Sequence, residues 1–281
     1  MQVLNISYIK IIIFFILFNL SFATQIITTT DFSTKILIDL KLEYLIIGEC
    51  GAGEIKFPKV NKLSNTLITN EKLYEIMPKV VIGREGSFQE NRLGTKQELK
   101  EIGIEPFIFY SAGPNSTLED FYKDLKNLGK VLGKEDIINN SIKKLKDSYN
   151  RLENKKKLKK AVFISSVGDT LGVVGSGGIL KDLLLKTDIS NLIENKADNY
   201  FKISWEFILD NEIDIIYILS KDEEESQNKY DQLRNSKLLN QKKAMLKNEV
   251  YFLNYFDIAP NIKFLDVIEN LNTTNLKRLS I

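Results

Sequence analysis

The sequence predicts an α/β protein built as two α/β lobes, each a parallel-type sheet flanked by helices, joined by one long helix. Two observations predict this class. Short runs rich in isoleucine, valine and aromatic residues alternate with helix-like segments, as in chains whose strands pair in parallel. The alternation stops once, between about residues 116 and 154, where two helical patterns follow each other. We therefore expect a first lobe over residues 24–134, an interlobe helix over 135–157 and a second lobe over 158–281.

The expected strands are short, apolar and separated by polar segments. They lie at residues 26–28, 44–47, 80–82, 107–110, 161–165, 215–219 and 250–253. Ser116 and Glu119 have the spacing of a capping box, which predicts a helix from there to about Val131. The next helix is expected from about Glu135 to Asn154, because apolar side chains recur there at helical spacing.

Residues 1–23 have the order of a secretory signal peptide. Lys10 precedes the apolar run 11–20, and residues 21–23 form a small-x-small ending. A membrane anchor is the alternative, but the run is short for a span of about 20 residues. We expect cleavage after Ala23 and a soluble periplasmic product without stable membrane insertion. Lipidation is not expected, because no cysteine lies at the cleavage point.

The composition excludes several classes of function. Histidine is absent and Cys50 is the only cysteine, which excludes Ser-His-Asp and Cys-His catalysis, zinc sites of imidazoles and thiolates, and an internal disulfide. The 39 basic and 37 acidic residues give a formal charge of +2, so no general attraction to nucleic acid is expected. The lysine-rich run 155–160 is expected to be a solvated face near a helix C-terminus. An exported α/β hydrolase, the alternative from another class, would need a histidine and a Gly-x-Ser-x-Gly elbow. The sequence has neither, so we expect no enzyme, no catalytic residues and no protein metal ligands.

An internal repeat relates the two lobes. Glu71 lies two residues after Thr69, Glu206 lies two residues after Ser204, and each glutamate stands nine residues before the start of an expected strand. Threonine and serine suit an N-cap, and a carboxylate in the first helical turn is stabilised by about 0.3–1 kcal/mol, which alone would explain one such glutamate. Two at equivalent places indicate a paired feature on one outer face.

Ligands of open α/β sheets gather at the carboxyl ends of the strands. The polar and aromatic residues there that we expect to contact a ligand are Thr29, Glu49, Arg84, Ser87, Tyr110, Asp169 and Tyr255. Arg84 directly follows an expected strand, and its guanidinium can bind a carboxylate, a phosphate or an anionic chelate in a forked geometry. Pairing with Glu85 or Glu90 on an exposed loop is an equally open alternative. The run 175–178 lacks a P-loop or dinucleotide fingerprint, so it is expected to be a turn and N-cap.

Several motifs together resemble those of a known family. They are residues 70–83 (NEKLYEIMPKVVIG), 99–104 and 116–133, Gly177-Gly178 ahead of a helix, and 204–206. On these motifs the chain resembles the periplasmic substrate-binding proteins of ABC importers whose lobes are joined by one long helix, the class III group that captures ferric siderophores, haem and cobalamin. The resemblance covers nearly all of the chain after residue 23. It implies that Glu71 and Glu206, one per lobe, form salt bridges with arginines of the permease dimer, and we expect the receptor to be a monomer.

The resemblance further implies a receptor that binds a metal chelate in the cleft between the lobes and delivers it to the permease, with no cofactor of its own. With Arg84 at the ligand face, we expect an anionic iron(III)-siderophore complex whose own oxygen atoms hold the iron. Cobalamin or another corrinoid is the nearest alternative within the family. Haem is less expected because histidine is absent, although tyrosine can serve as its axial ligand. A receptor for a bare metal ion would need a cluster of histidines and carboxylates.

Overall fold

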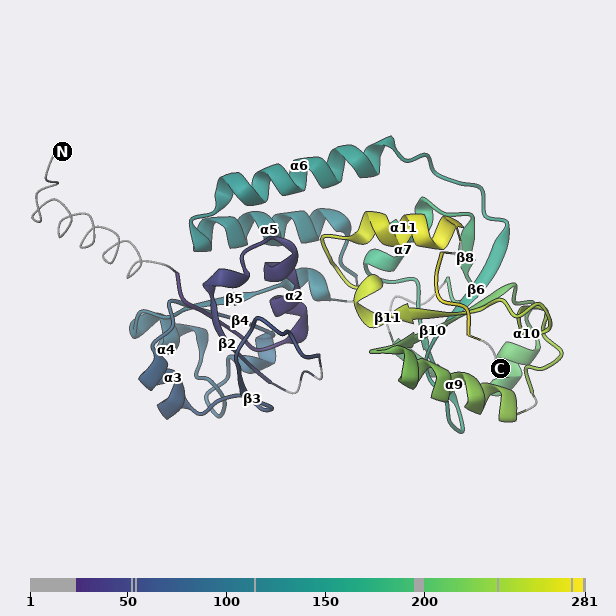
Figure 1. The fold of residues 1–281 in the computed structure, drawn as a ribbon, viewed down its shortest axis with the longest axis horizontal. Coiled ribbons are helices and arrows are strands. Elements are labelled where there is room, and N and C mark those ends of the chain that lie inside the picture. Colours follow the sequence, from purple (N-terminus) through teal and green to yellow (C-terminus); the bar gives the residue numbers. More distant parts are fainter. Residues whose placement is uncertain are drawn as a thin grey trace, which may run out of the picture. The chain divides into compact units, whose positions relative to one another are not determined.

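The computed structural model describes residues 24–51, 53, 55–113, 115–194, 200–236, 238–273 and 275–279. The chain divides into two compact units, of which the first ends at Ile108 and the second begins at Phe109 (Figure 1). The expected signal peptide, residues 1–23, lies outside the described residues. The expected lobe limits stay predictions.

A five-stranded sheet, in which every pair of neighbouring strands is parallel, forms the first unit. Its strands are β1 (Ile26–Thr28), β2 (Ile46–Cys50), β3 (Lys62–Ser64), β4 (Val80–Gly83) and β5 (Glu105–Ile108), in the spatial order β3-β2-β1-β4-β5. The helical elements are α2 (Asp31–Asp39), η1 (Glu43–Leu45), α3 (Asn70–Ile76), η2 (Glu85–Ser87) and α4 (Lys96–Glu101). The central strands β1 and β4 are buried along their whole length, which explains their continuous rather than alternating apolar sequences.

Two expected strands of this unit have different limits in the structure. The strand expected at 44–47 starts later, because its first two residues belong to the 3-10 turn η1, and it continues to Cys50. The strand expected at 107–110 starts earlier, at Glu105, since β5 is an edge strand and can accommodate Pro106. The edge strand β3 was not expected at all, because its sequence Lys-Leu-Ser carries no apolar run.

The second unit contains a mixed sheet. Its strands are β6 (Lys159–Ser166), β7 (Leu171–Val174), β8 (Ile189–Asn191), β9 (Tyr200–Ile203), β10 (Ile215–Ser220) and β11 (Val250–Asn254). The order is β11-β10-β6-β7-β9, with β8 paired to β6; β7 is antiparallel to both β6 and β9, and the other pairs are parallel. The C-terminal segment covers the free edge of β11, because the amide of Leu279 donates to Val250 and the amide of Phe252 donates to Lys277.

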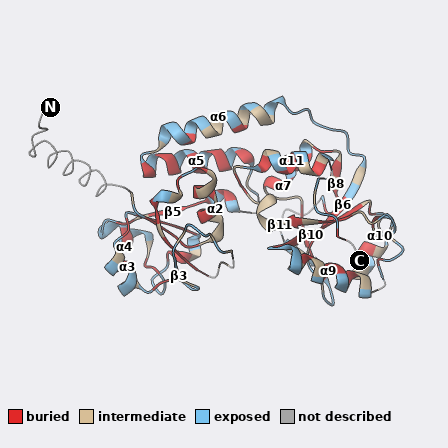
Figure 2. Ribbon diagram, in the orientation of Figure 1, coloured by how far each residue is buried: buried red, intermediate tan, exposed pale blue. Residues whose placement is uncertain are grey.

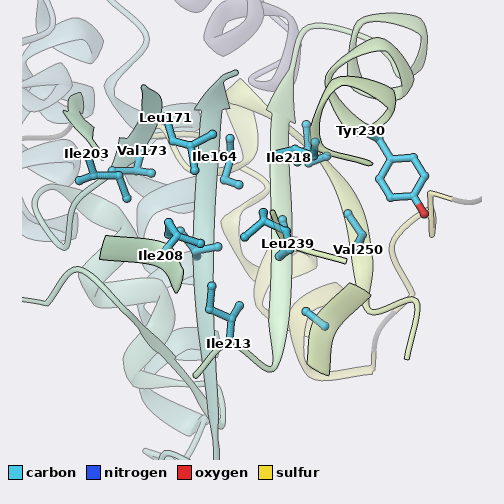
Figure 3. Packing of buried hydrophobic residues seen from close by; sticks show 14 of the residues in the cluster. Ile164, Leu171, Val173, Ile203, Ile208, Ile213, Ile218, Tyr230, Leu239 and Val250 are labelled. Atoms are coloured by element: carbon cyan, nitrogen blue, oxygen red, sulfur yellow. The ribbon is translucent and has the colours of Figure 1, made fainter. Parts of the chain in front are cut away.

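Helical elements make up the rest of the regular structure of the second unit, and α9 packs against β10 (Figure 1). They are η3 (Tyr110–Ala112), α5 (Leu118–Leu132), α6 (Glu135–Arg151), α7 (Ile179–Leu185), α8 (Trp205–Leu209), α9 (Glu223–Asn235), α10 (Lys243–Leu246), η4 (Tyr255–Asp257) and α11 (Phe264–Thr273). Alternate residues of β10 point to opposite faces. Ile218 joins the aliphatic cluster of Figure 3, whereas Tyr217 stacks on Phe163 at 4.9 Å between ring centroids. Both faces of β10 are therefore buried, as its continuous apolar sequence predicts.

The start of helix α5 differs from the expectation. The N-cap is Thr117, not Ser116: its hydroxyl accepts the amide of Asp120, and the Asp120 carboxylate accepts the Thr117 amide at 2.9 Å. Two overlapping capping boxes are possible because both Glu119 and Asp120 are acidic, and the spacing alone does not choose between them.

The long helix α6 ends at Arg151, before the expected limits of 154 and 157. It packs along α5 and also contacts α11, and it buries Ile138 and Leu145 while its outer side stays exposed (Figure 2). Among the described residues, every helix falls short of the length and apolar character that a membrane crossing requires.

The lysine-rich run 155–160 follows α6 instead of ending it. The Lys155 ammonium donates to the Asn272 side chain at 2.7 Å, and Lys157 donates to the carbonyls of Leu184 and Thr187 at the end of α7. Lys159 pairs with Asp188 at 3.2 Å. Residues 155–158 and 160 are exposed, as expected for a solvated face, and these three lysines in addition bind the segment to neighbouring elements of the second unit.

Candidate functional site

The carboxyl edge of the first sheet, defined here as the ends of β1, β2 and β4 with the residues that follow them, carries four of the expected ligand residues. Thr29 and Ser87 are both buried, and their hydroxyl oxygens lie 3.2 Å apart. Gly83 makes this approach possible, since a Cβ atom there would lie 2.4 Å from the Thr29 hydroxyl. The two hydroxyl groups therefore form a buried, hydrogen-bonded pair next to the loop that carries Arg84.

Arg84 occupies the N-cap position of η2 and is exposed. Its side chain makes no hydrogen bond or ion pair with any described residue. Glu85, one of the two expected partners, instead lies 4.0 Å from Lys96, and Glu90 forms no ion pair within the described part of the chain. The guanidinium at this edge therefore keeps its full hydrogen-bonding capacity.

Glu49 lies inside β2 and is only 2% exposed. Its carboxylate pairs with the Lys62 ammonium at 3.0 Å, and Lys62 also donates to the carbonyl of Gly53 at 3.1 Å. Burial raises the pKa of Glu49 above its ordinary value near 4.5, and nearby Asp31 raises it further, whereas Lys62 opposes the shift. Glu49 is thus a buried carboxylate whose charged neighbours, Lys62 and Asp31, lie nearer the surface and reach the loop after β2.

Two charged neighbours of Glu49, Lys62 and Asp31, were not among the ligand residues expected from the sequence. Asp31 begins α2; one carboxylate oxygen accepts the amide of Ile55 at 3.2 Å, and the other is buried without a partner. Asp31 was detectable as a polar residue following β1. Lys62 carried no such signal, because the short polar strand β3 that places it was not recognised.

The second sheet has a corresponding carboxyl edge at the ends of β6, β10 and β11. Tyr255 follows β11 in η4 and is half-buried. Its hydroxyl donates to the carbonyl of Ser165 at 3.2 Å and accepts a hydrogen bond of 3.0 Å from the ammonium of Lys229 on α9. Lys229 was also missed, because it lies far from Tyr255 in the sequence and inside a helix with no unusual pattern.

The other two expected ligand residues of the second unit are exposed. Asp169 lies in the loop between β6 and β7, beside Gly168, whose carbonyl accepts the Trp205 indole N–H at 3.1 Å. Tyr110 is 59% exposed in η3 and belongs to the second unit although it follows β5 in the chain. Its neighbour Ser111 is fixed by Asp124, which accepts the Ser111 amide at 2.7 Å.

The structure therefore brings the expected ligand residues together in two sets. Thr29, Glu49, Arg84 and Ser87 share the carboxyl edge of the first sheet. Asp169, Tyr255 and Tyr110 lie in the second unit, where Tyr255 and Asp169 follow strands of the same sheet.

Glu71 and Glu206 occupy equivalent places in their units. Thr69 and Ser204 are the N-caps of α3 and α8, and each cap hydroxyl accepts a helix amide at 3.3 Å. The helices precede β4 and β10, each of which pairs in parallel with the first strand of its sheet. Both glutamates are exposed and form no ion pair with described residues. Hydrogen bonds from its own amide and from Thr69 lower the pKa of Glu71, so it is ionised at neutral pH.

The two other features singled out in the sequence have structural roles. Residues 175–178 form the expected turn, with Gly178 as the N-cap of α7 at a φ of 64°, and the Ser176 hydroxyl donates to the carbonyl of Ile193. Cys50 is fully buried in β2, and burial raises the pKa of its thiol. Within the described residues, no three carboxylate, thiol or imidazole side chains come together as a metal-binding group.

Comparison with known proteins identifies the fold. The sequence matches the family described as "Periplasmic binding protein" over residues 26–255. Among solved structures, the haem-binding protein HutB of Vibrio cholerae is 16% identical with a TM-score of 0.74 and covers 90% of this chain and 99% of its own. An Fe3+-hydroxamate transport protein from Saccharomonospora viridis is 15% identical with a TM-score of 0.70, with coverages of 90% and 93%. The vitamin B12-binding protein BtuF of Vibrio cholerae is 15% identical with a TM-score of 0.61, with coverages of 89% and 96%.

No curated protein matches the sequence. At identities this low, likeness to the solved structures establishes the fold, and each ligand named above is that of the protein concerned.

Proposed function

Because the chain belongs to the periplasmic binding protein family, we propose that it captures an anionic iron(III) chelate of the siderophore type for an ABC importer. Members of this family are solute receptors and not enzymes. The fold is that of class III receptors. The structural relatives described above bind ferric hydroxamate, haem and vitamin B12, and among these ligand classes we propose the ferric siderophore.

The single observation that carries this choice is the guanidinium of Arg84, which has no hydrogen-bond or ion-pair partner among the described residues. It stands at the carboxyl edge of a parallel sheet, where ligands of such sheets bind. An arginine with no internal partner can donate two parallel hydrogen bonds to a carboxylate or to chelating oxygens. Thr29 and Ser87 lie in the same edge and add hydroxyl groups. Glu49 competes little for Arg84, since its carboxylate is buried against Lys62.

The iron would be held by the oxygen atoms of the chelator rather than by protein atoms. Ligand contacts are also proposed for Tyr255, Tyr110 and Asp169, the expected ligand residues of the second unit. Aromatic and hydroxyl groups suit the mixed apolar and polar surface of a catecholate or hydroxamate.

Glu71 and Glu206 are proposed as the contacts to the permease dimer. Their support is that both are exposed, both stand in the first turn of a short capped helix, and neither is paired with a described residue. Exposed ion pairs contribute about 0–1 kcal/mol each, so the two would set register, and shape complementarity would provide most of the affinity.

Export is part of the proposal. Residues 1–23 would direct the chain out of the cytoplasm and be removed after Ala23. N-terminal sequencing of the exported protein should read from Thr24, and a retained Met1 would contradict cleavage.

Titration of the purified chain tests the ligand. Trp205 is the only tryptophan, and its indole is bonded to the loop that carries Asp169, so its fluorescence reports on the second unit. A ferric tris-catecholate, a neutral ferric trihydroxamate, haemin and cyanocobalamin are compared, with equilibrium dialysis for any probe that leaves the fluorescence unchanged. We expect saturable binding that is tightest for the anionic catecholate. Silence toward all four, together with tight binding of a bare cation, would exclude a chelate receptor.

A further inference from the structure

The carboxyl edge of the second sheet contains a buried cation that the ligand proposal has not used. Lys229 on α9 is 9% exposed, and its ammonium has three hydrogen-bond partners. They are the Leu219 carbonyl at 2.7 Å, a Glu225 carboxylate oxygen at 2.7 Å and the Tyr255 hydroxyl at 3.0 Å. An ammonium has three N–H donors, so this one is saturated.

The network joins the ends of three strands. Leu219 lies at the end of β10 and Tyr255 follows β11, while the Tyr255 hydroxyl donates in turn to the carbonyl of Ser165 near the end of β6. The Lys229 ammonium also lies 5.2 Å from the centre of the Tyr255 ring. The phenol is therefore fixed at both its donor and its acceptor, and the side chain cannot turn about χ1 to another rotamer without breaking the charge-assisted bond from Lys229 and the bond to Ser165.

The charge of Lys229 is balanced locally. Glu225 lies one helical turn earlier on α9, and its other contacts are within the same turn: its second oxygen accepts the amide of Lys221 at 3.0 Å, and its own amide is capped by Asp222. Partial burial raises the pKa of Glu225, but the hydrogen bonds from Lys229 and from the Lys221 amide outweigh it, so the pKa is lowered. A buried charge costs stability unless it is paired, so a simple core position would be filled better by an apolar residue.

We propose that Lys229 is a positioning residue for ligand binding, which holds the Tyr255 ring in a single orientation at the carboxyl edge of the second sheet. This rests on the proposed function, because it assumes that Tyr255 contacts the bound chelate. Lys229 itself does not touch the ligand. Its effect is to remove the rotamer entropy that Tyr255 would otherwise lose on binding.

The test is a double-mutant cycle with Lys229→Met and Tyr255→Phe. The probe is the ferric tris-catecholate, or whichever of the four probes above the wild-type chain binds most tightly. Lys229→Met should weaken binding by about tenfold. In the Tyr255→Phe background, which has no hydroxyl for Lys229 to hold, the same change should have less than about a twofold effect. Glu224→Gln is the matched control, since Glu224 is an exposed carboxylate on the same helix and has no contact with Lys229 or Tyr255 among the described residues; its affinity should be nearly that of the wild type.

A merely structural role would give a different pattern. Loss of affinity from Lys229→Met that persists in the Tyr255→Phe background would overturn the proposal, and so would unchanged binding in Lys229→Met. The 13C resonance of the Tyr255 ring in selectively labelled protein reports on the contact without ligand, and it should move in Lys229→Met but not in Glu224→Gln. If the wild type binds no probe while this resonance still moves, the proposed function fails and the positioning role fails with it, although the contact is real.

Discussion

Arg84 is the side chain on which ligand selectivity depends most. Replacing it by glutamine removes a charged donor, and a hydrogen bond to a charged group contributes about 1.5–3 kcal/mol. Arg84→Gln should therefore weaken binding of a ferric tris-catecholate by at least about tenfold. Binding of a neutral ferric trihydroxamate should change by less than about twofold.

Arg92→Gln is the matched control for this prediction, because Arg92 is also an exposed arginine of the loop that follows β4. Isothermal titration of the three proteins at low and high salt gives the comparison, and the Arg84 effect should shrink as the ionic strength rises. Equal losses for both ligands, or for both variants, would show that Arg84 does not bind the anion.

Glu49 provides a prediction about pH. Its pKa is higher in the folded chain than the ordinary value near 4.5, so the folded state holds a proton that the unfolded state releases first. Its contribution to stability is therefore fully present below about pH 4.5 and declines as the pH rises through the folded pKa. Relative to Glu49→Gln, the wild type should lose unfolding free energy over this interval.

Chemical unfolding of both proteins at a series of pH values from 4 to 8 measures the difference. Glu75→Gln is the control, since Glu75 is exposed on α3 and Lys72 is its one ion-pair partner among the described residues. A difference between wild type and Glu49→Gln that grows in favour of the wild type with rising pH would mean that Lys62, rather than burial, dominates the pKa of Glu49.

For single residues, the sequence identifies site residues that directly follow a strand, and it misses residues that reach the same sheet edge from another element. Arg84, Thr29 and Tyr255 were found because each comes directly after an apolar run. Lys62 and Lys229 reach the same edges from a polar edge strand and from a helix, and only the tertiary structure places them there. Whether any of these residues touches a ligand stays a prediction.

Among the elements, the N-terminus of α5 allows the sharpest test. Thr117 and Asp120 form its capping box, whereas the neighbouring Ser116 only donates to the carbonyl of Tyr110. Loss of a capping side chain costs about 1 kcal/mol. Thr117→Ala should therefore lower the free energy of unfolding by about that amount, and Ser116→Ala by less than about 0.5 kcal/mol. Thermal and urea unfolding of the two variants make the measurement, and the reverse ranking would place the cap at Ser116.

Most of the strands that were predicted from the sequence are buried in the centre of their sheets. Strands β1, β4, β6, β10 and β11 are apolar because they are buried in the sheets, so their positions were found within a few residues. Strands β3, β8 and β9 are short and partly polar, so their composition does not distinguish them from loops. Strand β7 is the exception: it is buried throughout, but it is only 4 residues long, contains Gly172 and was not recognised. The alternation of strands and helices predicts parallel pairing, so the antiparallel pairing of β7 was not expected.

For the whole molecule, the two units repeat one local arrangement. In each, a short capped helix with a glutamate in its first turn leads into a strand that pairs in parallel with the first strand of the sheet. The repeat was visible in the sequence as equal intervals from Glu71 and Glu206 to the next strand, and the structure confirms both N-caps.

The double variant Glu71→Ala/Glu206→Ala should spare ligand affinity and impair permease-dependent uptake in cells. Glu75→Ala/Glu212→Ala removes the same charge from the same two regions and should leave uptake near normal. Uptake assays with a radioactive iron chelate, alongside titration of the purified proteins, separate the two effects. Loss of ligand binding in the first variant, or equal loss of uptake in both, would rule out docking by this pair.

The central claim is that an anionic chelate binds beside Arg84 with the iron held by the chelator. Anomalous diffraction at the iron edge, from crystals grown with a ferric tris-catecholate, tests it most directly. We predict one iron peak per chain, surrounded by catecholate oxygens, with the Arg84 guanidinium hydrogen-bonded to the chelate. An iron atom coordinated by protein side chains, or a chelate bound away from Arg84, would contradict the account.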